Sequence, residues 1–189
     1  MAKFRFVFFI VIAASLLSCF LSTDASAQRR DYMTDAESDV VREAQDIDLR
    51  IDVLIKIIDR RFSVLKVNVG GATIPTKESE KWGPAPTGTR MEILDDIRKL
   101  LDKAVDDVDN VAMHPVKYEE DKNRSEKQKK KDEMRFPSSV RNLAAAAQRY
   151  QPALKSLIDS SKDEKEKGLI LASLESCDEI IGAMTKLPN

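Results

Sequence analysis

The sequence is short of the residues on which several protein classes depend. It has two cysteines, one histidine and six glycines among 189 residues, and only 6% of its residues are aromatic. Two cysteines cannot build the several disulfides of a small stapled domain. Six glycines are too few for the turns of a many-stranded sheet. The glycine-rich patterns that hold nucleotide phosphates, G-x-G-x-x-G and G-x-x-x-x-G-K-[ST], are missing as well.

The first residues have the features of a secretory signal peptide. Lys3 and Arg5 precede residues 6–17, which carry no charge, and the small residues Ala25 and Ala27 form an A-x-A cleavage motif. We therefore predict that residues 1–27 are a cleaved signal peptide and that residues 28–189 form one domain, secreted into a bacterial periplasm. The uncharged run is shorter than the roughly 20 residues that cross a bilayer. No stable membrane span is therefore expected after cleavage.

There is an alternative interpretation of this leader. Residues 16–19, which end at Cys19, resemble a lipobox, in which the cysteine is lipidated and becomes the new N-terminus. The protein would then be an envelope lipoprotein tethered through Cys19. If cleavage instead follows Ala27, the mature chain keeps only Cys177, which falls in an apolar stripe and is expected to be a buried small hydrophobic residue.

Apolar side chains recur with a helical period in four segments, at about residues 35–67, 90–112, 139–159 and 162–186. One-sided stripes of this kind are typical of amphipathic helices that pack against each other. The sequence therefore predicts an all-α domain, a four-helix bundle with up-down-up-down topology, either monomeric or homodimeric.

Capping patterns accompany three of these stripes. Thr34, Thr89 and Ser161 each stand three residues before a glutamate, as in a capping box, and are expected to begin helices. Pro152 falls inside the third stripe, where we expect a kink because proline removes a backbone hydrogen bond.

Candidate catalytic chemistry is sparse. The sole histidine, His114, stands at a predicted helix end, where a capping role is favoured over metal or haem ligation, and C-x-x-C-H is absent. The lysine-rich residues 127–131 lie among carboxylates, which favours a solvated connection or an exposed charged extension of a helix. Four aspartates on the second predicted helix have nearby basic partners and fit a solvated face: Asp95, Asp102, Asp106 and Asp109. No catalytic residue, metal or cofactor is predicted, although a haem- or metal-carrying bundle remains the alternative.

The only tryptophan lies in a loop rich in glycine and proline. Trp82, Pro84 and Pro86 could present a rigid aromatic anchor to a partner protein. The alternative is that Trp82 folds back onto the helices. Because the chain is slightly acidic, with a net charge of −1, a nucleic-acid partner is not expected. The functional prediction is a non-catalytic binding or structural module that contacts an unknown protein partner in the envelope.

Overall fold

The computed structural model describes residues 30–71, 79–115 and 125–187. The described residues from Tyr32 onwards belong to one compact unit. The predicted signal peptide, with Ala25, Ala27 and Cys19, lies outside the described residues. In the part of the chain that is described, no helix combines the length and hydropathy needed to cross a membrane.

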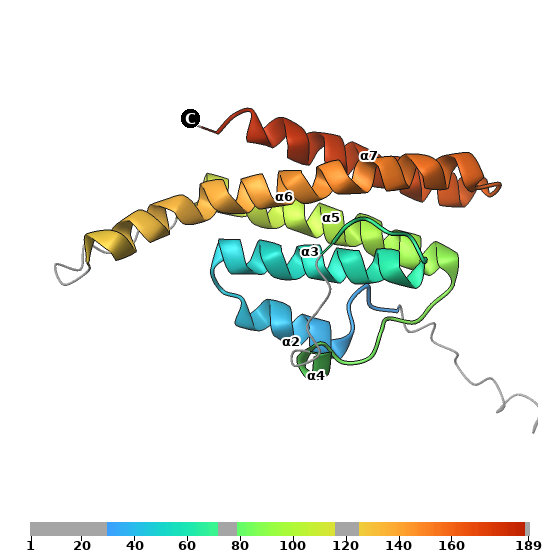
Figure 1. Ribbon diagram of the computed structural model, residues 1–189, viewed down its shortest axis with the longest axis horizontal. Helices are drawn as coiled ribbons and strands as arrows, with labels where there is room; N and C mark the ends of the chain where they lie inside the picture. Colours follow the sequence, from blue (N-terminus) through green and yellow to red (C-terminus); the bar gives the residue numbers. More distant parts are fainter. Residues whose placement is uncertain (1–29, 72–78, 116–124, 188–189) are drawn as a thin grey trace, which may run out of the picture. The chain divides into compact units, whose positions relative to one another are not determined.

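The described residues fold into helices and contain no strand, which confirms the predicted all-α class. In chain order the helices are α2 (Asp35–Glu43), α3 (Ile47–Val64), α4 (Ser79–Trp82), α5 (Arg90–Met113), α6 (Glu126–Ser160) and α7 (Glu164–Met184) (Figure 1). Two predicted capping boxes are present. Thr34 begins α2 and Thr89 begins α5, each with both reciprocal hydrogen bonds to the glutamate three residues later.

The predicted first helix, residues 35–67, is in fact two helices. Ala44 ends α2 with ψ near 81°, and Asp46 has an extended backbone before α3 begins. The Arg50 guanidinium donates to the Ala44 carbonyl (2.9 Å) and so satisfies an acceptor at the helix end. Because the chain turns here, α2 folds back along α3, and its stripe residue Val40 is buried there. Periodicity continues across the break, so the sequence pattern did not reveal it.

The predicted third helix begins earlier than residue 139. In the structure α6 starts at Glu126, where the Ser125 hydroxyl accepts from the Gln128 amide (3.3 Å). Of the two alternatives for the lysine-rich run, the structure shows the helix extension, and its lysines are exposed. The helix continues through both Pro137 and Pro152.

The predicted capping box at Ser161 is wrong. Ser161 ends α6, and Asp163 caps α7 by accepting from the Lys165 amide (2.7 Å). The Ser161 hydroxyl donates instead to Glu166 (2.9 Å). The connection between α6 and α7 is so short that Ser161 is the C-cap of α6, and Asp163 takes the N-cap position of α7.

Four of the helices build the core. Helix α3 packs against α5 and α6, and α7 packs against the same two helices from the other side. Figure 1 shows that α3, α5, α6 and α7 alternate in direction along the chain. The consecutive helices α5 and α6 make few contacts with each other, so they lie on a diagonal of this arrangement.

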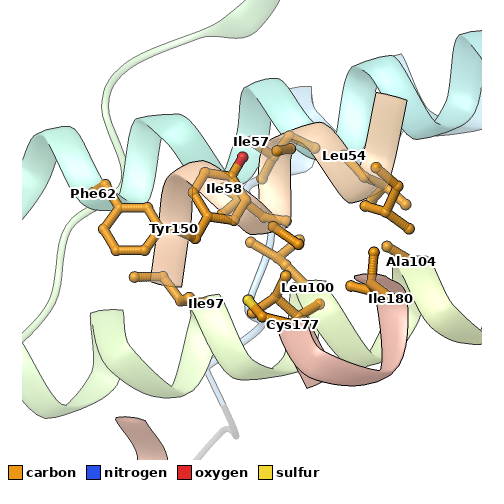
Figure 2. Packing of buried hydrophobic residues seen from close by; sticks show 14 of the residues in the cluster. Leu54, Ile57, Ile58, Phe62, Ile97, Leu100, Ala104, Tyr150, Cys177 and Ile180 are labelled. Carbon is orange, nitrogen blue, oxygen red and sulfur yellow. The ribbon is translucent and has the colours of Figure 1, made fainter. Parts of the chain in front are cut away.

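The core between these helices is apolar and closely packed (Figure 2). The rings of Phe62 and Tyr150 stack with centroids 5.1 Å apart. Leu54, Leu100 and Cys177 are completely buried, as predicted for the cysteine. Burial of large apolar side chains, at about 1.5–3 kcal/mol each, is the main favourable term for this fold.

Candidate functional site

The Trp82 segment is tied to the helices rather than presented on the surface. Trp82 is 3% exposed, and its ring lies beneath the charged ends of Lys56 and Arg60, at 5.8 and 5.9 Å. Arg60 also donates to the carbonyls of Trp82 (2.9 Å) and Pro84 (2.6 Å). The indole therefore occupies the folded-back position that the sequence analysis offered as its alternative. Pro86 is buried and Pro84 is exposed, and a partner contact at this segment stays a prediction.

A buried charge network fixes α2 to α3 and α5. The Arg61 side chain, 1% exposed, donates to both oxygens of Glu37 (2.8 and 2.7 Å) and to Asp96 (3.0 Å). Glu37 also accepts from Arg60 (2.7 Å) and the Thr34 amide (2.9 Å). Burial alone would raise the pKa of Glu37, but hydrogen bonds from Arg61 and Thr34, together with the two arginine charges, lower it. Every group in the network is paired and enclosed, so its role is structural.

A second buried carboxylate, Asp59, lies between α3 and α6. It accepts from the Tyr150 hydroxyl (2.8 Å) and, more weakly, from Arg149 (3.5 Å). Burial raises the pKa of Asp59 despite these two partners, and burial beside this carboxylate also raises the pKa of Tyr150 well above its usual value. The backbone of Gly71 closes the site, because a Cβ there would lie 2.1 Å from an Asp59 oxygen.

The best candidate for a binding site is a cleft of about 550 Å³ where α3 begins, α5 ends and the first half of α6 passes by. In Figure 1 these three segments lie at the same end of the helices, and α6 projects beyond the start of α3. We call this the α3–α5–α6 cleft. Its lining residues are Gln45, Asp46, Ile47, Arg50, Val111, Ala112, Pro115, Asp132, Glu133, Arg135 and Phe136.

The cleft has an apolar wall and a charged rim. Ile47 and Phe136 pack against the hydrophobic core from its edge, while Val111 and Ala112 come from the last turn of α5. Most of the surface that lines the cleft is apolar. Such a wall beside a few polar groups is typical of sites that hold a ligand or the side chains of a partner.

A single guanidinium organises the charged rim. Arg135, whose side chain is 11% exposed, pairs with Asp46 (2.5 Å), Asp48 (3.0 Å) and Asp132 (3.0 Å). Burial alone would lower the pKa of Arg135, but the hydrogen bonds and charges of these aspartates raise it above its usual range. Three carboxylates thus share one positive charge at the edge of the cleft.

The remaining predicted sites have local partners. His114 caps the end of α5, where its ring nitrogen lies 3.2 Å from the Asn110 carbonyl. On α5, Arg98 pairs with Asp95 and Asp102 (2.8 Å each), as expected for a solvated face. Burial, with Asp178 nearby, raises the pKa of the Cys177 thiol to about 12. Within the described ranges, no group of three potential metal-ligating side chains comes together.

The cleft residues escaped sequence reasoning for two reasons. The turn at Asp46 was hidden by a continuous apolar period, and Arg135 and Phe136 were assigned to a connection. One signal was available, because Ser125 and Gln128 match the S-x-x-Q form of a capping box and so indicate that a helix begins there. The convergence of three helix segments has no local signature.

Comparison with protein-family models, with curated proteins and with solved structures finds no match for this chain.

Proposed function

We propose that this protein is an exported, non-catalytic module, a four-helix bundle of α3, α5, α6 and α7, that binds a partner protein through the α3–α5–α6 cleft. The observation that carries the proposal is the cleft itself. Its volume of about 550 Å³ lies within the roughly 300–1,000 Å³ of typical binding clefts. This is enough for large apolar side chains of a partner.

The electrostatics of the chain favour binding over catalysis. Glu37 and Asp59, two of the carboxylates with a shifted pKa, are buried in paired networks away from the cleft. The aspartates of the cleft are ion-paired with Arg135. A general acid or base requires a perturbed group within reach of substrate, and the cleft offers charge and apolar surface instead.

Two surface alanines provide a matched test. Ala112 lines the mouth of the cleft and Ala145 lies on α6 away from it, and both are exposed. We expect affinity capture from the envelope fraction to retain the same partner on the wild type and on Ala145→Trp, and to lose it on Ala112→Trp. Circular dichroism should show equal helicity in all three proteins. A partner that is retained equally by both tryptophan variants would contradict the proposal.

Export rests on the leader and has a separate test. The mass of the protein purified from its native cells should correspond to a chain that begins at Gln28. A diacylated chain that begins at Cys19 would identify an envelope lipoprotein, and an intact Met1 would contradict cleavage.

A further inference from the structure

We propose that the α3–α5–α6 cleft selects a partner segment in which a large apolar side chain is flanked by basic residues. This inference rests on the proposed function and names the chemistry of the partner. The large apolar side chain of the partner segment would lie against Ile47, Val111 and Phe136. The basic residues of that segment would meet the carboxylates at the rim of the cleft.

The charges of the cleft do not balance. Four carboxylates belong to its lining or to its ion-paired edge, namely Asp46, Asp48, Asp132 and Glu133. Two guanidinium groups oppose them, Arg50 and Arg135. Among the described groups that line the cleft or pair at its edge, negative charges therefore exceed positive charges by two. Glu133 is exposed and has no ion pair within the described residues.

The neighbouring elements leave this excess in place. The last turn of α5 contains no basic residue, and its free carbonyls add negative partial charge. The N-terminus of α3 adds about half a positive charge, which is smaller than the excess of negative charge. On α6, Lys129 is paired with Glu126 (2.9 Å).

The other lysines in the first half of α6 point away from Phe136, which lines the cleft. At about 100° per residue, Lys127 lies opposite to Phe136, and Lys130 and Lys131 lie about 120° and 140° from it. They are exposed to solvent. An acidic segment in the cleft would therefore meet the rim carboxylates without compensation from these lysines.

The binding of three labelled peptides to the full mature protein tests this inference. The peptides share one central pair of leucines and differ only in their flanking residues, which are three lysines, three glutamines or three glutamates. We expect the lysine peptide to bind roughly tenfold tighter than the glutamate peptide, with the glutamine peptide between them, as measured by fluorescence anisotropy. The preference should shrink at high salt, because Glu133 is exposed and the Asp46 side chain is 43% exposed, so that salt can screen both charges.

Two variants and one control variant locate the effect. Glu133→Gln should weaken the lysine peptide by about two- to threefold and leave the glutamine peptide unchanged, since only one exposed charge is removed. Ala112→Trp should weaken all three peptides, whereas Ala145→Trp should weaken none. Binding that Ala112→Trp leaves intact would overturn the inference, because the peptides would then occupy another surface.

Failure of this inference can be told apart from failure of the proposed function. Equal affinity for the three peptides, no binding of any of them, or a preference for the glutamate peptide overturns the charge selectivity. The capture experiment with Ala112→Trp would still decide whether the cleft binds a partner. Sedimentation tests whether the wild type dimerises and whether Ala112→Trp abolishes that dimer. If both hold, the occupant of the cleft is a second copy of this chain, and the inference is overturned.

Discussion

Replacing Glu37 with alanine should be among the most damaging substitutions in this chain. Glu37 is fully buried and accepts hydrogen bonds from Arg60, Arg61 and the backbone amide of Thr34. The variant would leave two neighbouring guanidinium groups without the carboxylate that they share. Arg61 would keep Asp96 and the Tyr32 carbonyl, but its side chain is only 1% exposed, so bulk solvent does not replace the lost carboxylate.

The expected loss in the free energy of unfolding is about 4 kcal/mol. Breaking one side of a buried ion pair costs about 3–5 kcal/mol, because a charge is left without compensation. The reciprocal half of the capping box at Thr34 is lost as well, which contributes about 1 kcal/mol or less. Because a domain of this size is stabilised by roughly 5–15 kcal/mol in total, the variant should remain folded at room temperature with a small margin.

Urea unfolding followed by circular dichroism measures this loss directly. A matched control is Asp39→Ala on the same helix, because Asp39 pairs with Arg42 at the surface, with 65% and 76% of the two side chains exposed. The control should change stability by about 0.5 kcal/mol or less. A loss below about 1 kcal/mol for Glu37→Ala would refute the view that this network holds α2 to the core.

The pH dependence of this difference gives a second check. Since the folded-state pKa of Glu37 is lowered, its contribution is fully present above its unfolded-state value, about pH 4. The contribution disappears as the pH falls through the folded-state pKa. The gap in stability between wild type and Glu37→Ala should therefore narrow in acid.

Three further predictions concern the core. The Cys177 thiol, fully buried and with its pKa raised to about 12, should not react with a thiol reagent until guanidinium unfolds the protein; rapid reaction of the native protein would contradict its burial. The folded-state pKa of Asp59 is raised, so protonation of Asp59 stabilises the fold. As the pH falls through that pKa, the wild type should therefore gain stability relative to Asp59→Asn, as measured by urea unfolding. Gly71→Ala places a Cβ against an Asp59 oxygen and should cost about 1–3 kcal/mol, whereas Gly168→Ala, with open space at its Cβ, should not lower the thermal midpoint.

Local chemistry was sufficient to predict the helical class and much of the secondary structure. A hydroxyl at Thr34 or Thr89 with a glutamate three residues later can satisfy the free amides of a first helical turn without help from the rest of the chain. The burial of Cys177 followed from its place in an apolar stripe. These features depend on residues within one or two turns of each other, and for that reason the sequence reveals them.

The break before α3 and the position of Trp82 depend on residues far apart in the chain. The α2–α3 turn at Ala44 is fastened by Arg50, and Trp82 is held by Arg60, which lies 22 positions earlier. The cleft forms because the end of α5 and the first half of α6 meet at the start of α3, where Arg135 reaches Asp48 across 87 positions. Such long-range pairings depend on how whole helices pack against each other, and a short-range sequence pattern does not contain that information.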